Sequence, residues 1–205
     1  MNKPDLSVSV CGVPFQNPVI AASGCFGFGQ ELAEYVDLNA LGGISIKGLT
    51  PKPRLGNPAP RIAETPSGML NSVGLQNPGV DHFIEEDLPW LKQQGTVVIA
   101  NIAGNTQQDY CRMAEKLSES DVDMVELNIS CPNVKHGGVA FGTSCASVEE
   151  ITVAMRKYCR QPLIVKLSPN AADIGEIASP ADAGGADGQS DAGVGQGLGD
   201  ARQAA

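Results

Sequence analysis

The sequence is poor in basic residues, in aromatic residues and in long hydrophobic runs, and these deficits exclude several classes of function. Its 205 residues include 14 Lys and Arg against 23 Asp and Glu, a formal net charge of -9. A chain this acidic, without a basic patch, does not suit nucleic acid or an anionic membrane as its main partner. No apolar run approaches the roughly 18 residues of a membrane span, and the first residues do not form a signal peptide. We therefore expect a cytoplasmic protein that binds neither nucleic acid nor membrane.

Histidines and paired cysteines are also scarce. The two histidines are His82 and His136, and none of the six cysteines forms a C-x-x-C pair. This spacing does not match a zinc or iron–sulfur site, so no metal centre is predicted. The cysteine count allows disulfides, but without a secretory signal we expect reduced thiols.

What the sequence does contain is a regular alternation of apolar and amphipathic segments. With 42% hydrophobic and 18% charged residues, its composition is typical of one globular domain. Short apolar runs typical of buried strands lie at residues 18–22, 43–46, 96–100, 124–127 and 163–165. Segments with helical spacing lie at residues 30–38, 80–93, 106–119 and 147–158. This alternation predicts an α/β fold with a parallel sheet buried on both faces.

Several local features refine this prediction. Residues 6–15 alternate like a short hairpin, and residues 50–78 are rich in Pro, Gly and Asn, which is typical of a functional loop when a connection is this long. Thr106 is predicted to cap one helix, and Ser147, with Glu150 three residues on, to open another with a capping box. Pro89 is expected to kink its helix or end it early.

Each predicted strand leads to a polar residue at its carboxyl end. Parallel sheets bind ligands at that edge, so these side chains are expected to meet at one site. A lysine at the end of a buried strand is otherwise out of place, although a surface lysine that extends into water is the alternative. The five residues are Ser23, Lys47, Asn101, Asn128 and Lys166.

The fourth of these strands opens into a loop with a single cysteine, Cys131, between a serine and Pro132. Pro132 restricts Cys131 to extended backbone, and Gly137 and Gly138 allow the loop to bend over a ligand. Most cysteines are simply small buried residues. Here, Asn128 and Asn133 flank the thiol and offer amide groups that suit a planar polar ligand.

Two stretches of the sequence resemble the dihydroorotate dehydrogenases, most closely the class 1, B-type catalytic subunits. They are the segment Asn128 to Asn133, which reads NISCPN, and the segment Pro60 to Gly79, which reads PRIAETPSGMLNSVGLQNPG. The resemblance extends from about residue 5 to about residue 188. It implies a (β/α)8 TIM barrel that binds FMN and oxidises (S)-dihydroorotate to orotate in de novo pyrimidine biosynthesis.

The resemblance also implies roles for individual residues. Cys131 would be the base that removes a proton from the dihydropyrimidine ring while hydride leaves the neighbouring carbon for FMN. A thiol, with an ordinary pKa of roughly 8.5, supplies some thiolate near neutral pH. The implied substrate-binding residues are Lys47, Asn71, Ser72, Val73, Gly74, Leu75 and Asn128. The implied FMN-binding residues are Ser23, Lys47, Gly48, Asn101, Asn128 and Lys166.

B-type relatives work with a second subunit that carries FAD and an iron–sulfur cluster and passes electrons to NAD. The resemblance therefore implies an electron-transfer subunit as partner and assembly as a homodimer or heterotetramer. This chain has no cysteine spacing for a cluster of its own, which agrees with a catalytic subunit that depends on such a partner.

The chain departs from the family pattern near its end. Only about the first five βα units of the eight-stranded barrel are expected, so residues 1–188 are predicted to form an incomplete barrel domain. Residues 189–205 contain few apolar residues and are predicted to be disordered. This loss of pattern resembles a truncation or a shifted reading frame. The segments that would hold the FMN phosphate in the family follow strands seven and eight.

Three alternatives remain open from the sequence. One is a catalytically inactive fragment of the same enzyme, suggested by the end of the chain. A second is a flavoenzyme similar to dihydropyrimidine dehydrogenase, although the run from Asn71 to Leu75 favours dihydroorotate. A thiol protease using Cys131 and His136 is the weakest, because no orienting acid or oxyanion hole is evident.

Overall fold

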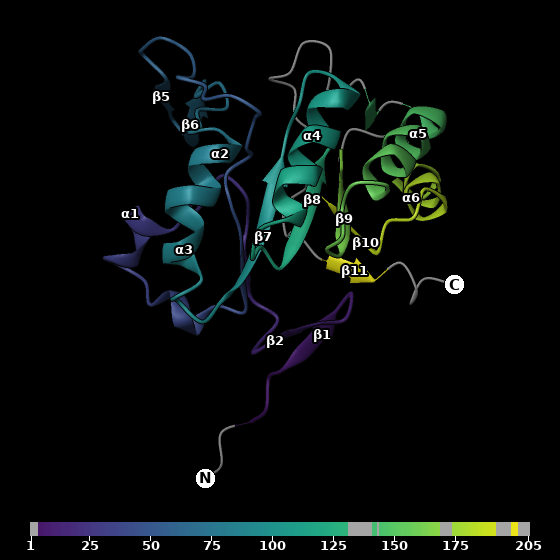
Figure 1. Cartoon of the computed structure of the whole chain (residues 1–205). Coiled ribbons are helices and arrows are strands. Elements are labelled where there is room, and N and C mark those ends of the chain that lie inside the picture. Colours follow the sequence, from purple (N-terminus) through teal and green to yellow (C-terminus); the bar gives the residue numbers. More distant parts are fainter. Residues whose placement is uncertain (1–3, 131–140, 143, 169–173, 192–197, 201–205) are drawn as a thin grey trace.

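A curved sheet of parallel strands forms the centre of the molecule (Figure 1). The computed structural model describes residues 4–130, 141–142, 144–168, 174–191 and 198–200. Within them, the strands lie in the order β10 (Gly188–Asp191), β9 (Leu163–Leu167), β8 (Met124–Asn128), β7 (Val97–Ile102), β4 (Gly43–Ser45) and β3 (Ile20–Ala21). All neighbouring pairs in this series are parallel. The predicted α/β class and parallel sheet are therefore confirmed.

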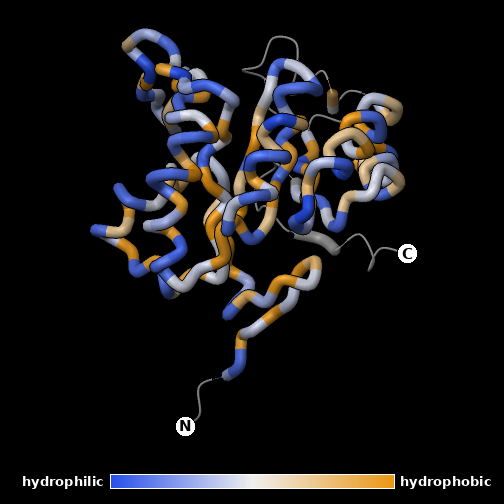
Figure 2. The backbone as a smooth tube through the Cα atoms, viewed as in Figure 1, coloured by the Kyte–Doolittle hydropathy of each residue, from blue (hydrophilic) through white to orange (hydrophobic). Residues whose placement is uncertain are grey.

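Helices cover the convex face of this sheet. The long ones are α4 (Gln107–Ser118), α5 (Cys145–Arg156) and α6 (Ile174–Ala183), which lie beside strands β7 to β10 (Figure 1). The shorter helical pieces are α1 (Gln30–Ala33), the 3-10 helix η1 (Leu38–Ala40), α2 (Val80–His82), the π-helical turn η2 (Phe83–Asp87) and α3 (Leu88–Leu91). Figure 2 shows hydrophobic residues gathered along the central strands and polar residues along the outer surfaces of the helices.

The two faces of the sheet carry different side chains because successive strand residues point to opposite sides. Val98, Val125 and Val165 pack with the helices in the main hydrophobic core. Ile99, Met124 and Ile164 point to the other face and form a separate small cluster with Phe15. Phe15 belongs to the predicted hairpin, now observed as β1 (Val8–Val10) and β2 (Val13–Phe15). This hairpin closes the amino-terminal end of the sheet.

The long loop predicted at residues 50–78 contains a hairpin of its own. Strands β5 (Ile62–Thr65) and β6 (Gly68–Asn71) pair antiparallel and lie at the opposite end of the sheet from β1 and β2 (Figure 1). Arg61 holds the base of this hairpin through three hydrogen bonds, from Nε to Asn57 O, from Nη1 to Gln76 Oε1 and from Nη2 to Leu55 O. The loop is therefore ordered above the carboxyl ends of the strands.

Three local predictions differ from what is observed. A sixth parallel strand, β10, follows the five expected ones, and β11 (Leu198–Asp200) pairs antiparallel with it. The ordered chain thus continues past the expected limit at residue 188, while residues 192–197 and 201–205 of the predicted disordered tail lie outside the described residues. Helix α5 begins at Cys145 with Ser144 as its N-cap, not at Ser147, because the Ser144 hydroxyl accepts a hydrogen bond from Ser147 N at 3.2 Å.

The other helix signals were read correctly or in part. Thr106 caps α4 through a capping box in which its hydroxyl accepts from Asp109 N at 3.1 Å. Helical residues continue through Pro89 to Leu91, so Pro89 does not end the helix early. The π-helical turn Phe83–Asp87 directly precedes this proline. Among the described residues, no helix is long and apolar enough to cross a membrane, and no group of three or more acidic, His or Cys side chains could hold a metal ion.

The π-helical turn places the carboxyl group of Asp87 in the protein interior. Asp87 is 8% exposed, its Oδ1 accepts a long hydrogen bond of 3.4 Å from Gln30 Nε2, and its Oδ2 accepts none within the described part of the chain. His82 Nε2 lies 4.0 Å from Oδ2. Burial raises the pKa of Asp87 above its ordinary value of 3.8, and the nearby His82 opposes this shift.

Replacing Asp87 by asparagine is therefore expected to stabilise the chain at neutral pH. Because the folded state holds the proton more tightly than the unfolded state, the stability of the parent falls as pH rises from about 4 through the raised pKa. Asp87→Asn should raise the free energy of unfolding at pH 7 by about 0.5–1 kcal/mol, with the gain disappearing below about pH 4. Urea titrations at both pH values measure this, and an equal gain at pH 7 and pH 3.5 would contradict it.

Candidate functional site

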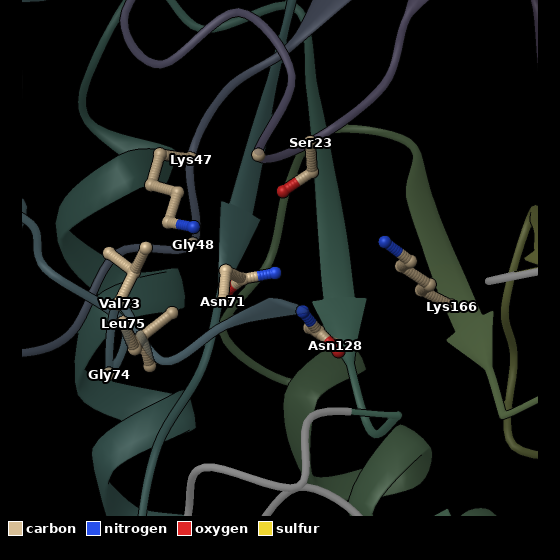
Figure 3. Close-up of a pocket in the computed structure, with 10 residues that line it drawn as sticks. Ser23, Lys47, Gly48, Asn71, Val73, Gly74, Leu75, Asn128 and Lys166 are labelled. Atoms are coloured by element: carbon tan, nitrogen blue, oxygen red, sulfur yellow. The ribbon is translucent and has the colours of Figure 1, made fainter. Parts of the chain in front are cut away.

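A pocket lies at the carboxyl ends of the parallel strands, where the sequence predicted a site. Figure 3 shows the side chains of Ser23, Lys47, Asn71, Asn128 and Lys166 directed into this common space. The complete lining is Ser23, Gly24, Lys47, Gly48, Asn71, Val73, Gly74, Leu75, Asn128 and Lys166. The structure therefore brings together residues from β6, β8, β9 and the segments that follow β3 and β4.

The segment after β4 is held in place by β7. Ile46 N donates to Ile99 O at 3.1 Å and Leu49 N donates to Asn101 O at 2.9 Å, so the parallel pairing with β7 continues past the end of β4. Gly48 sits closely against its neighbours, since a Cβ at this position would lie 2.9 Å from Asn101 Oδ1 and 3.1 Å from the Leu75 side chain. Any larger residue at position 48 would displace one of these two.

Lys166 is the most unusual residue of the pocket. It lies on β9 and is only 7% exposed, yet neither it nor Lys47 forms an ion pair with another described residue. A buried ammonium group without a counter-charge is costly, and an anionic or strongly polar ligand would offset that cost. Figure 3 shows its Nζ pointing into the pocket from the side opposite Lys47.

The segment 71–75 forms the wall of the pocket facing the long loop. Gly74 has φ +76°, and a Cβ there would lie 2.6 Å from Asn57, so only glycine fits. Leu75 follows with φ 55°, a conformation that leucine rarely adopts, and its side chain packs on Ala103. Such strain persists only where the surrounding structure holds it in place.

Asn77 makes many of the contacts that keep Leu75 in this conformation. Its side chain is buried, its Oδ1 accepts from Thr50 N at 3.1 Å and Gly79 N at 3.0 Å, and its Nδ2 donates to Leu75 O at 2.9 Å and Thr50 Oγ1 at 2.9 Å. One amide thus connects the pocket wall to the segment after β4. Asn77 belongs to the family-like segment Pro60 to Gly79, but no individual role was predicted for it from the sequence.

Two predicted site residues do not line the pocket. Asn101 is completely buried behind it, where its Oδ1 accepts from Asn128 Nδ2 at 3.2 Å. The Ser72 side chain is exposed and its hydroxyl accepts from Asn57 Nδ2 at 3.0 Å. Cys131, together with Asn133 and His136, lies outside the described residues.

Two further residues were missed. Gly24 lines the pocket beside Ser23. Glu126 lies on β8 directly beneath the pocket, is 4% exposed, and accepts a hydrogen bond from Asn101 Nδ2 at 2.5 Å. The signal for Glu126 was present in the sequence, because an acidic residue inside an otherwise apolar strand requires buried hydrogen-bond donors.

Two of the described cysteines are poor candidates for a reactive thiol. Burial raises the pKa of Cys159 to about 11 and also raises that of Cys111. Cys25 and Cys145 are exposed thiols. A raised pKa leaves little thiolate near neutral pH, so neither Cys159 nor Cys111 is suited to act as a base.

Comparisons with known proteins identify the family. The family model described as dihydroorotate dehydrogenase matches residues 5–191. The dihydroorotate dehydrogenase B (NAD(+)) catalytic subunits of Alkaliphilus metalliredigens and Petrotoga mobilis are 60% and 55% identical over 188 and 183 residues, which is 92% and 89% of this chain. The chain spans 62% and 61% of those relatives' length.

Solved structures show the same fold. Crystal structures of DHODH from Eimeria tenella, one with ferulenol and one ligand-free, superimpose with TM-scores of 0.75 and 0.74 at 24% identity. They cover 91% of this chain, and the chain covers 59% and 61% of theirs. The curved parallel sheet is thus part of a TIM barrel. The chain belongs to the dihydroorotate dehydrogenase family, whose members are oxidoreductases with a flavin cofactor.

Proposed function

We propose that this chain is the catalytic subunit of a B-type dihydroorotate dehydrogenase, which oxidises (S)-dihydroorotate to orotate in pyrimidine biosynthesis. One observation carries the proposal: two ammonium groups, which form no ion pair with another described residue, and two amides converge on a single pocket at the carboxyl edge of the sheet. This donor set suits a planar ligand that combines carbonyl oxygens, ring N–H groups and negative charge. The names of the relatives support the same substrate.

The residues present fit FMN as the cofactor. Lys166, Lys47, Asn128 and the backbone around Ser23 and Gly48 would hold its ring system, and when bound it would accept hydride from the substrate. Asn101 would contribute from behind, through the Asn128 amide that it orients. Lys47, Asn128 and residues 71–75 would hold the carboxylate and ring carbonyls of dihydroorotate.

Cys131 is proposed as the base. The thiolate would take a proton from one ring carbon as hydride leaves the adjacent carbon, so that a carbon–carbon double bond forms in the product. Asn128 Oδ1 accepts from Ser130 N at 3.1 Å and from Ser130 Oγ at 2.9 Å, which fixes the chain immediately before Cys131. The proton acceptor would therefore be attached to a rigid strand end.

We further propose that electrons leave through a second subunit that carries FAD and an iron–sulfur cluster and reduces NAD, in an assembly of two catalytic chains with or without two such partners. The printed names of the relatives, catalytic subunits of an NAD(+)-linked enzyme, support a separate partner. The acceptor used by this chain can be tested by comparing NAD reduction with and without the partner subunit of a relative.

The first experiment is the visible spectrum of the desalted chain, followed by anaerobic addition of dihydroorotate. Bound flavin that bleaches with dihydroorotate but not with dihydrouracil supports the proposal. Flavin that bleaches with dihydrouracil instead would indicate a dihydropyrimidine dehydrogenase. Absence of flavin, even with added FMN, would show that this chain is an inactive fragment.

Lys166 gives a prediction with opposite signs for binding and stability. Lys166→Met should weaken FMN binding about 10- to 100-fold, because a charge-assisted contact is lost. The flavin-free chain should become more stable by about 1 kcal/mol, since an unpaired buried charge is replaced by an apolar side chain of similar length. Fluorescence titration with FMN and urea unfolding measure the two effects. Lys157→Met, at an exposed lysine after α5, is the control and should change neither.

A further inference from the structure

Glu126 is an acidic residue in the middle of a buried strand. It lies on β8, is 4% exposed, and forms no ion pair with another described residue. A buried carboxylate is costly unless hydrogen-bond donors replace the water it has lost. The structure supplies three such donors, each from a different strand.

These donors come from both sides of β8. Glu126 Oε2 accepts from Ser45 Oγ at 2.7 Å and from Asn101 Nδ2 at 2.5 Å, while Oε1 accepts from Ser190 Oγ at 2.7 Å. Ser45 ends β4 and Ser190 lies on β10, each two strands away from β8 in opposite directions. The carboxylate therefore bridges the concave face of the curved sheet beneath the pocket.

The carboxylate also determines how two amides are oriented. Because it can only accept hydrogen bonds, Asn101 must turn its Nδ2 toward Glu126 and its Oδ1 toward the pocket side. That oxygen accepts from Asn128 Nδ2 at 3.2 Å, which leaves Asn128 Oδ1 to accept from Ser130 N and Oγ. Gly48 lies against Asn101 Oδ1, since a Cβ at this position would approach that oxygen to 2.9 Å.

We infer that Glu126 is a positioning residue that sets the donor and acceptor order of the Asn101–Asn128–Ser130 series. Through this series it fixes which amide atoms Asn128 presents to the ligand and how Ser130 is held at the end of β8. The ligand's identity rests on the proposed function, whereas the orientation of the amides does not. Loss of the carboxylate would allow both amides to rotate, and the pocket would no longer present one fixed pattern.

Three variants separate positioning from mere support of the fold. Glu126→Met removes the acceptor at similar length. Glu126→Gln keeps an oxygen for Asn101, because its amide nitrogen can face Ser190, whose hydroxyl can turn to accept. Ser45→Ala removes one hydrogen bond from the same Oε2 without touching Asn101, and is the matched control.

The first measurement needs no bound flavin. It follows the NMR signals of the side-chain amides in a chain whose asparagines are labelled with nitrogen-15. Glu126→Met should shift the Asn101 and Asn128 signals and speed their exchange with water at least about tenfold, the loss expected for a bond to a charged group. Glu126→Gln and Ser45→Ala should stay within about threefold of the parent. The dissociation constant for FMN, where the parent binds it, should follow the same order.

Unchanged Asn128 signals in a folded Glu126→Met chain would overturn the inference. Equal losses in Ser45→Ala and Glu126→Met would do the same, because they would indicate general loosening. If Glu126→Met does not fold, the test is made on the parent protein. Its Asn101 amide protons must show nuclear Overhauser contacts to the Glu126 side chain, and the absence of these contacts refutes the assigned orientation. A parent that binds no FMN would refute the proposed function while leaving this test intact.

Discussion

Replacing Cys131 by alanine is expected to slow the bleaching of bound flavin by dihydroorotate about 10²- to 10⁴-fold, the usual contribution of a positioned base. Flavin should remain bound with an unchanged spectrum, because the ring-binding groups proposed here are Lys47, Asn128 and Lys166. Stopped-flow absorbance under anaerobic conditions measures the rate. The effect should be confined to the chemical step, with little change in the affinity for orotate.

Two further variants sharpen the Cys131 prediction. Cys131→Ser should keep a small residual rate that rises with pH, since a hydroxyl offers far less of its ionised form than a thiol near neutrality. Cys145→Ala, at an exposed thiol on α5, should react like the parent. A near-normal rate in Cys131→Ala would show that another group is the base.

Replacing Asn77 by alanine is expected to have the largest effect on the fold around the site. The change leaves Thr50 N, Gly79 N and Leu75 O without their side-chain partner in a buried environment. We expect a loss of about 2–4 kcal/mol in the free energy of unfolding, because several buried polar groups become unsatisfied at once. Urea unfolding measures this loss.

The Asn77 variant should also loosen the pocket wall. Leu75 holds a left-handed backbone conformation that is unfavourable by itself, so losing the Asn77 contact should let residues 71–75 relax. Faster hydrogen exchange in residues 71–79 and weaker binding of orotate are the expected results. Asn39→Ala, at an exposed asparagine whose side-chain amide donates to Asp37 Oδ1, should cost less than about 0.5 kcal/mol. Comparable losses in both variants would show that Asn77 has no special role.

Most of the elements could be predicted because their signals are local. Apolar runs, helical spacing and the Thr106 cap depend on neighbours in the sequence, and the observed β4, β7, β8 and β9 lie where such runs occur. Local signals also led to one error, the predicted start of α5. Ser144 and Ser147 are both good N-cap residues, and only the backbone at Ser144 has the extended conformation of an N-cap. The sixth strand was missed because Gly188–Asp191 has almost no apolar character and is ordered by pairing with β9.

The sequence predicted some residues of the candidate site correctly and misplaced others. Polar residues at the ends of strands could be collected on one edge by topology alone, and Lys47, Asn128 and Lys166 do share a pocket. Asn101 and Ser72 were assigned to the ligand together with them, but side-chain packing places Asn101 behind the pocket and Ser72 on the surface. A family resemblance assigns roles to positions in the sequence, whereas the exposure of each side chain depends on the residues that surround it in the fold.

By itself, the sequence determined the α/β class, the parallel strands and the group of polar residues at their carboxyl ends, since these follow from periodicity and from the rule that parallel strands share an edge. Only the tertiary structure decided which of those residues face one another. The curvature of the sheet lets Glu126 reach Ser45 and Ser190 on opposite sides, and this arrangement orients Asn101 and Asn128. Such contacts join residues far apart in sequence, so no local pattern records them.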